Sequence, residues 1–142
     1  GIANEVNSSK LAFRRGEILF SKIRPYFHKV AVAPVDGICS TDAIVISAKS
    51  DEYYPLILAC VSSDEFVAHA TQTSQGTKMP RANWKVLTKY LVPIPPPDLL
   101  TRFNELMTDL VRVIQTLVFR SRNLSATRDL LLPRLVSGGL AV

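Results

Sequence analysis

The sequence predicts a mixed α/β (α+β) domain over residues 1–97, followed by a long C-terminal α-helix and tail over residues 98–142. Short runs of β-branched residues, separated by turn signals, indicate strands in the first part. The period becomes helical after Ile94–Pro97, where three consecutive prolines impose an extended break. With 142 residues, 47% of them hydrophobic and 20% charged, the chain can bury one core and is unlike a disordered protein.

Four strands are expected in the first part of the chain. Glu17–Ile23 and His28–Ala33 alternate partly between apolar and polar residues, contain several β-branched residues and are the first two. The turn Pro34–Gly37 follows, in which proline sets φ and glycine tolerates a positive φ. Ile38–Ser40 and Ala43–Ser47 are expected as two further strands and complete the set.

Two short helices and a loop are expected next. Leu56–Ser62 forms the first helix, and Asp64–Thr71 forms the second, with its first residue as a candidate N-cap. Residues 72–80 are small and polar and predict a loop. Asn83–Val92 returns to a helical turn or a strand around Trp84, which we expect in the core because its flanks are apolar.

The last segment has the apolar spacing of a long helix. A helix over Asp98–Leu132, with Asp98 as N-cap, would span roughly 50 Å at 1.5 Å per residue. Pro133 and the glycines after it are expected to end the helix. The apolar stripe either packs on its own domain or pairs with a partner helix; its heptad spacing favours a partner for much of it. The expected pairing residues are Leu99, Phe103, Leu106, Leu110, Val113, Leu117 and Leu124.

The charge distribution favours a polyanionic partner. The formal net charge is +5 and the pI is about 9.5. Residues 1–30 carry six basic and two acidic residues, and residues 71–90 carry four basic residues and no acid. Residues 36–65 between them carry six acids and one lysine. Two basic segments suggest a positive face that could bind nucleic acid, although an ordinary basic domain with solvated lysines remains an alternative.

The chemistry of an enzyme is not evident. The sequence has no G-x-G-x-x-G, P-loop or H-E-x-x-H motif. His28 and His69 lack partners at metal-ligand spacing and are expected to be surface or hydrogen-bonded histidines. Asp36 and Asp42 could form a carboxylate pair, but Asp36 is better explained by the turn. We therefore expect a binding module rather than a catalyst.

Neither a membrane nor a secreted location is expected. The longest apolar run, near Pro55–Val61, is far shorter than the roughly 20 residues of a spanning helix. No basic-then-apolar leader opens the sequence. The two cysteines are too few for a disulfide framework or a thiolate zinc site. A reducing cytoplasm is the expected location.

Several blocks of sequence, in a fixed order, match the pattern of one family. They are Gly16–Val30 (GEILFSKIRPYFHKV), Cys39–Asp42, Ala43–Ile46, Phe66–Trp84 (FVAHATQTSQGTKMPRANW), Val92–Pro97 and Leu130–Leu140 (LLLPRLVSGGL). Together they resemble the specificity (S) subunit of type I DNA restriction-modification enzymes. The resemblance covers nearly all of residues 14–142.

The resemblance implies a division of labour. An S subunit carries two target recognition domains, each followed by a long helix, and the two helices pair antiparallel. Each domain reads one half of a split DNA site. The subunit has no catalytic site; it binds modification subunits that methylate adenine with S-adenosylmethionine, and a restriction subunit joins them. For this chain the resemblance implies no cofactor of its own, with S-adenosylmethionine, ATP and Mg²⁺ on the partner subunits.

The chain departs from the family by having one recognition domain and one spacer helix, and the domain is short at its N-terminus. It is expected to be a natural half-subunit or a fragment. Two copies of a half-subunit could supply both halves of a DNA site. We therefore expect a homodimer through the long helix, which would read a split palindrome.

The expected DNA contacts fall in two segments. The turn Lys22–Lys29 is basic and stiffened by a proline, and the loop Gln72–Asn83 combines amides with cations and hydroxyls. Amides and fork-shaped cations suit base edges, whereas other cations and hydroxyls suit phosphates. A basic hairpin tip and a solvated loop are the alternatives. The expected residues are Lys22, Arg24, Tyr26, Lys29, Gln72, Thr73, Ser74, Gln75, Gly76, Thr77, Lys78, Arg81 and Asn83.

Two rival functions stay open from the sequence. The chain could be a non-catalytic assembly module that oligomerises and docks a protein partner without reading DNA. It could also be a nuclease or methyltransferase fragment, although it lacks a cofactor loop and a carboxylate cluster. Salt-dependent binding to duplex DNA separates the first rival from a DNA reader, because phosphate neutralisation gives a steep salt slope.

Overall fold

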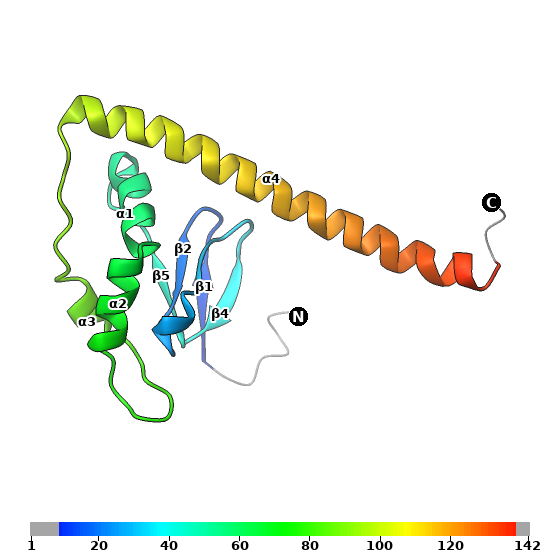
Figure 1. Ribbon diagram of the computed structural model, residues 1–142, viewed down its shortest axis with the longest axis horizontal. Coiled ribbons are helices and arrows are strands. Elements are labelled where there is room, and N and C mark those ends of the chain that lie inside the picture. The colour runs from blue at the N-terminus through cyan, green and yellow to red at the C-terminus, as the bar shows by residue number, and fades with distance from the viewer. Residues whose placement is uncertain (1–8, 139–142) are drawn as a thin grey trace. The chain divides into compact units, whose positions relative to one another are not determined.

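The computed structural model describes residues 9–138 and divides into two units, which are described separately (Figure 1). The first unit ends at Glu105, and the second begins at Leu106. The described part of the first unit holds strands, three short α-helices and the first turns of a long helix, α4. The expected α+β class is confirmed.

A three-stranded antiparallel sheet organises the first unit. Its central strand β2 (Ile18–Ser21) pairs with β3 (Val30–Val32) on one side and with β5 (Ala43–Ile46) on the other. The register sets Ile18 opposite Ile46 and Phe20 opposite Ile44. All four side chains are buried, because residues two apart on a strand share one face. The three predicted strands of this sheet are confirmed, each shorter than expected.

A separate two-stranded ribbon joins β1 (Lys10–Phe13) to β4 (Gly37–Ser40). The strand β1 was not predicted, since its four residues have no alternating pattern and its pairing depends on a distant strand. Gly37 does not have the positive φ that was expected of it. A Cβ there would lie 2.7 Å from the ring of Phe13, its cross-strand partner, so this ring would have to shift to admit a larger residue.

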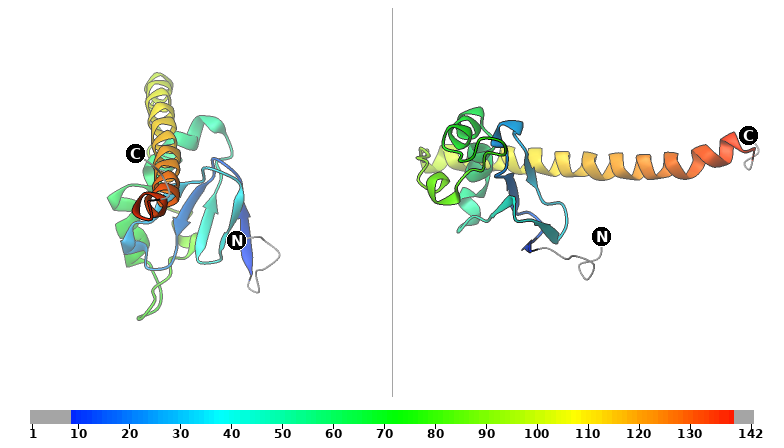
Figure 2. Two further views of the ribbon diagram at one scale, coloured as in Figure 1. Left: turned by 90° about the vertical axis from the view of Figure 1, so that its right-hand side faces the viewer. Right: turned by 90° about the horizontal axis from the view of Figure 1, so that it is seen from below.

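Helices α1 (Tyr54–Val61) and α2 (Asp64–Gln72) lie on one side of the three-stranded sheet (Figures 1 and 2). Phe66 of α2 is 3% exposed, and its ring meets Phe20 edge-on, with ring centroids 5.5 Å apart. Tyr90 packs edge-on against Phe66 at 5.2 Å. The core therefore lies between the sheet and these two helices.

The expected N-cap of α2 is wrong by one residue. Asp64 is the first residue of the helix, and Ser63 caps it by accepting a hydrogen bond from the Phe66 backbone N–H at 3.2 Å. Both serine and aspartate favour this position, so composition alone did not separate them. A third helix, α3 (Trp84–Leu87), is a single turn within the expected Asn83–Val92 segment.

Helix α4 (Pro97–Val136) begins one residue earlier and ends four residues later than expected. Asp98 therefore lies in its first turn and is not its N-cap. Pro133 lies inside the helix, where its missing N–H removes one hydrogen bond near the end. The helix continues because later donors are still paired; Ser137 N–H donates to the Pro133 carbonyl at 3.0 Å. Gly138 follows with a φ of +69°, and Gly139 lies outside the described residues.

The first turns of α4 belong to the first unit. Leu100 is only 2% exposed, and the Asn104 side-chain amide donates to the Glu52 carbonyl at 2.8 Å. Leu99, an expected pairing residue, is 57% exposed, whereas Phe103 is partly buried.

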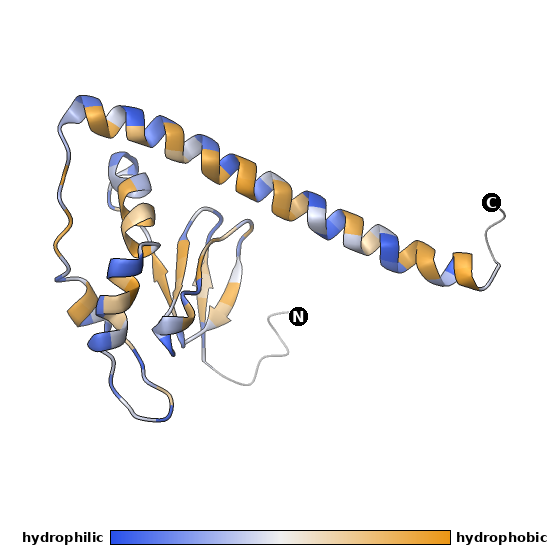
Figure 3. Ribbon diagram, in the orientation of Figure 1, coloured by the Kyte–Doolittle hydropathy of each residue, from blue (hydrophilic) through white to orange (hydrophobic). Residues whose placement is uncertain are grey.

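The second unit is the remainder of α4, along which apolar and hydrophilic residues alternate (Figure 3). Its expected pairing residues are between 47% and 71% exposed: Leu106, Leu110, Val113, Leu117 and Leu124. Apolar side chains at heptad spacing are thus available to a partner helix. The pairing itself stays a prediction.

Replacing Phe20 by alanine should lower the free energy of unfolding of the first unit by about 3–5 kcal/mol, because it empties a fully buried site. Urea unfolding followed by the fluorescence of Trp84, the single tryptophan, measures it. As a control, Leu91→Ala removes a side chain that is 90% exposed and should cost less than about 0.5 kcal/mol. Equal losses in the two variants would contradict this core.

Candidate nucleic-acid interface

The two segments predicted to contact nucleic acid lie side by side. The Arg24 backbone N–H donates to the Pro80 carbonyl at 2.7 Å, and the Ala82 N–H donates to the Lys22 carbonyl at 2.8 Å. Ile23 and Arg81 form an isolated antiparallel bridge between these bonds. The structure therefore joins the basic turn Lys22–Lys29 to the loop that follows α2.

The turn has an unusual and well-anchored backbone. Its centre is a 3-10 turn, η2 (Pro25–Phe27), flanked by Arg24 and His28, with φ angles of 47° and 51°. Such left-handed conformations are costly for residues other than glycine and persist where the surroundings hold them. Pro25 is fully buried below the turn, whereas Tyr26 is 50% exposed.

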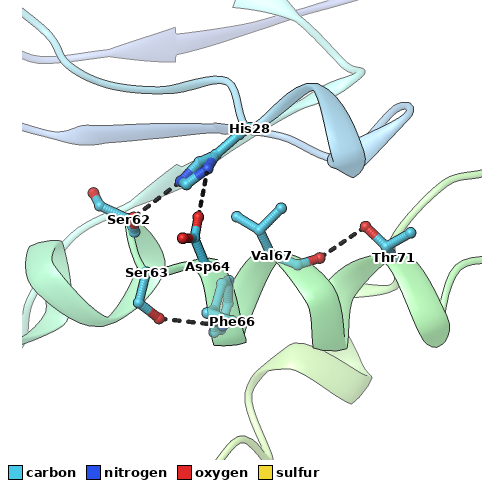
Figure 4. Close-up of polar contacts among 7 residues, drawn as sticks. All are labelled: His28, Ser62, Ser63, Asp64, Phe66, Val67 and Thr71. Atoms are coloured by element: carbon cyan, nitrogen blue, oxygen red, sulfur yellow. Dashed lines mark hydrogen bonds and ion pairs between the residues drawn. The ribbon is translucent and has the colours of Figure 1, made fainter.

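His28 ties the turn to the junction between α1 and α2 (Figure 4). Its Nε2 lies 2.9 Å from the Ser62 carbonyl oxygen, and its Nδ1 lies 3.4 Å from a carboxylate oxygen of Asp64. Both ring nitrogens thus face oxygen acceptors. The expectation of a surface or hydrogen-bonded histidine is confirmed, and the ring helps to hold η2.

The loop after α2 closes as a narrow hairpin. Gln75 and Arg81 exchange two backbone hydrogen bonds, at 3.0 and 2.8 Å. Gly76 begins the enclosed tip with a φ of +100°, a conformation that favours glycine. Thr77 and Lys78 are exposed on that tip. The hairpin therefore presents a short, basic tip to solvent.

Three polar side chains predicted to contact DNA also stabilise helix ends. The hydroxyls of Thr73 and Ser74 donate to carbonyls in the last turns of α2, at 2.7 and 2.6 Å. The Asn83 side-chain oxygen caps α3 by accepting from the Lys85 N–H at 3.0 Å. The amide NH₂ group of Asn83 has no part in that cap. Thr73 and Ser74 thus hold the base of the loop.

The other predicted residues lie around the two segments. Gln72 is the exposed last residue of α2. The ammonium of exposed Lys29 lies 5.3 Å from the centre of the Phe27 ring, so these neighbours form a cation–π contact. Arg24 is partly buried, and its Nε is buried with no hydrogen-bond partner among the described residues.

A groove with a volume of ≈ 930 Å³ lies between the hairpin and strands β1 and β5. We call it the basic groove. Four of the predicted residues line it: Lys22, Gln75, Arg81 and Asn83. Thr41, Trp84 and Lys85 also line it and were not predicted as contacts, together with Leu11, Ala12, Ala43, Ile44, Val45 and Ala82.

Trp84 does not occupy the core position expected of it. Its side chain is 42% exposed, while Leu87, on the same helix turn, is 3% exposed. A single turn of helix can bury only one of its sides, and in α3 the buried side carries Leu87. Lys85 lies next to Trp84 in a segment without acidic residues. This feature of the sequence could have indicated that the candidate interface extends to these two residues.

An ion pair crosses one side of the basic groove. Arg81 Nε donates to Asp42 Oδ1 at 2.9 Å. This hydrogen bond lowers the pKa of Asp42; partial desolvation opposes the shift, and the charges of Arg81 and Lys22 reinforce it. The same hydrogen bond and charge raise the pKa of Arg81. Asp36 instead accepts a hydrogen bond from the Arg15 N–H at 2.7 Å, so the two aspartates do not form a carboxylate pair.

A second, mainly apolar cavity of ≈ 620 Å³ lies beside α1 and α3. Cys60 lines it, and burial raises the pKa of its thiol. Cys60 and Cys39 are both free and partly buried rather than fully in the core. Within residues 9–138, no cluster of three or more His, Cys, Asp or Glu side chains suits a metal ion. In the same range, none of the helices combines the length and the hydrophobicity of a membrane-spanning segment.

Comparison with known proteins identifies a family and a curated relative. Residues 2–115 match the family described as "Type I restriction modification DNA specificity domain". The chain is also 37% identical over 91 residues to the Escherichia coli "Type I restriction enzyme EcoDI specificity subunit". That match covers 64% of this chain and 20% of the relative, so the chain spans about one fifth of the relative's length.

The carboxyl group of Asp42 should titrate below its ordinary pKa because Arg81 stabilises its charged form. The ion pair then stabilises the fold above the unfolded pKa of aspartate, and this contribution disappears as the pH falls through the lowered folded pKa. NMR titration of the Asp42 carboxyl group measures the shift. In Arg81→Gln the pKa should rise toward its ordinary value; an unchanged pKa would contradict the role of Arg81.

Proposed function

We propose that this chain, which belongs to the family of type I restriction-modification DNA specificity domains, reads duplex DNA through the basic groove and the two segments beside it. The observation that carries the proposal is the joining of the turn Lys22–Lys29 to the hairpin by backbone hydrogen bonds. Two basic segments that are distant in the sequence thereby form one surface. Such a surface supplies the electrostatic attraction on which DNA binding depends.

The side chains of this surface suit both kinds of DNA contact. Lys22 and Lys85 in the groove and Lys78 on the exposed tip supply cations for phosphates. Gln75 and Asn83 supply amides that can pair with base edges. In the proposal, phosphate contacts position the chain and the amides contribute to sequence choice.

The proposed role in the larger assembly is recognition without catalysis. In it, the chain directs adenine methylation and cleavage that partner modification and restriction subunits perform. S-adenosylmethionine, ATP and Mg²⁺ would bind those partners. The family match and the relative's name as a specificity subunit support this role. In the proposal, the chain acts in the cytoplasm, beside cellular DNA.

The proposal assigns residues 1–97 to target recognition and residues 98–142 to spacing and pairing. The apolar residues of α4 from Leu106 to Leu124 are exposed at heptad spacing, which supports a homodimer through this helix. A two-fold dimer would present two copies of the basic groove to two half-sites.

Binding of the full chain to a mixture of duplex DNA sequences should weaken steeply with salt. Replacing Lys22 or Lys78 by alanine should weaken binding by a similar factor for every sequence. Each substitution should also reduce the slope of log K against log salt by about 0.9 for every phosphate that the lysine neutralises. Fluorescence anisotropy over a range of salt concentrations measures both quantities.

The control is Lys49→Ala, which removes a cation that is exposed, like Lys78, and does not line the basic groove. It should leave affinity and slope close to those of the unsubstituted chain. Absence of salt-dependent binding, both alone and with a cognate modification subunit, would favour a pure assembly module instead. Mapping of methylated adenines by that complex tests the role in modification.

Replacing Leu110 by glutamate should abolish dimerisation, because it places a charge in the proposed helix seam. Sedimentation at tens of micromolar should show a dimer for the unsubstituted chain and a monomer for the variant. Thr108→Glu introduces the same charge at an exposed position outside the heptad seam and should remain dimeric. A monomeric unsubstituted chain would contradict the pairing.

A further inference from the structure

The geometry points to Arg81 as a guanine-reading side chain that Asp42 holds in place. This inference rests on the proposed function, because it assigns one base contact within the basic groove. It adds a chemical class of target, a guanine edge in the major groove, and a positioning residue that carries the opposite charge.

The backbone of Arg81 is fixed on all sides. Its N–H and carbonyl both pair with Gln75, and the residues before and after it bond to Arg24 and Lys22. The side chain therefore starts from a rigid point at the end of β2. A side chain that starts from a rigid point loses less conformational entropy on binding.

The two terminal nitrogens of the Arg81 guanidinium remain available for a base. Nε is the atom that donates to Asp42, at 2.9 Å, and within residues 9–138 the two terminal Nη groups donate no hydrogen bond. The Arg81 side chain is 48% exposed. A guanine presents two neighbouring acceptors, O6 and N7, which match the two N–H groups at the end of an arginine fork.

The carboxylate that orients the fork is itself anchored. The Asp42 N–H donates to the Ser40 hydroxyl at 3.1 Å, and the Asp42 carbonyl accepts from the Lys22 N–H at 2.9 Å. Lys22, on the same groove, is a further cation near this carboxylate. The direction of the Arg81 guanidinium is therefore set by the start of strand β5 rather than by solvent.

The charge of Asp42 favours a base over a phosphate. A carboxylate beside the arginine reduces its attraction for an anionic phosphate, because like charges repel. A guanine edge is neutral and carries only acceptors toward the fork. Stability alone gives a weak reason for the pair, since exposed ion pairs contribute little to folding. The amides of Gln75 and Asn83 on the same groove also suit base edges.

The experiment selects DNA from a randomised duplex library with the full chain, alone and with a cognate modification subunit. The unsubstituted chain should enrich a motif that contains one guanine dependent on Arg81. Arg81→Lys keeps the charge but loses the fork, and it should reduce the preference for guanine at that position by about 5- to 150-fold. Replacing that guanine by 7-deazaguanine, which lacks N7, should weaken binding of the unsubstituted chain more than binding of Arg81→Lys, because a lysine cannot donate through a planar fork.

Asp42→Asn gives a second readout. If Asp42 only stabilised the fold, its replacement would not weaken one kind of DNA binding and strengthen another. It should reduce the preference for the same guanine while it strengthens binding to unrelated duplex DNA, since a negative charge is removed from the groove. Arg128→Lys is the matched control, because Arg128 is also an exposed arginine paired with an aspartate, Asp129, and does not line the groove. It should leave the motif unchanged.

The outcomes separate the inference from the proposed function. Enrichment of a motif that both Arg81→Lys and Asp42→Asn leave unchanged, with both variants shown to be folded by Trp84 fluorescence, overturns the inference alone. Enrichment of no motif by the unsubstituted chain, alone or with the modification subunit, overturns the proposed function and the inference with it.

Discussion

The backbone hydrogen bonds between residues 22–24 and residues 80–82 are the constraint on which the candidate interface depends. They fasten the hairpin after α2 to the end of the central strand β2. The strand β2 lies in the middle of the sheet and carries the buried Ile18 and Phe20. The hairpin is therefore held in place by a strand of the core. A reading surface needs this support, since misplaced base contacts lose both affinity and selectivity.

Acidic residues organise the basic surface rather than oppose it. The middle of the chain is rich in acids, yet three of them pair with groups from the basic N-terminal and hairpin segments. Asp36 accepts from the Arg15 backbone, Asp42 pairs with Arg81, and Asp64 lies beside His28. Each pairing fixes a piece of the surface while other cations remain exposed for a polyanion. Acidic and basic residues that are grouped separately along the sequence therefore lie next to each other in the folded chain.

The two units meet different physical demands. The first unit buries its apolar residues between a sheet and two helices, which leaves polar and cationic side chains at the rim. The second unit is a helix with exposed leucines and valines at heptad spacing, a surface that gains most from a partner helix. A rigid recognition domain and a helix that can pair are the two parts that the proposed DNA-binding dimer requires.

The sequence by itself determined the fold class, the predicted strands from β2 to β5, helices α1 and α2, and the long α4, because periodicity and proline placement are local signals. It also predicted both segments of the candidate interface. Only the tertiary structure decided that these segments meet, that Trp84 and Lys85 belong to the same groove, and that Asp42 orients Arg81. It likewise decided the pairing of β1 and the close approach of the Phe13 ring to Gly37. The reason is physical: each of these features depends on contacts between residues far apart in the chain, and no local pattern encodes such contacts.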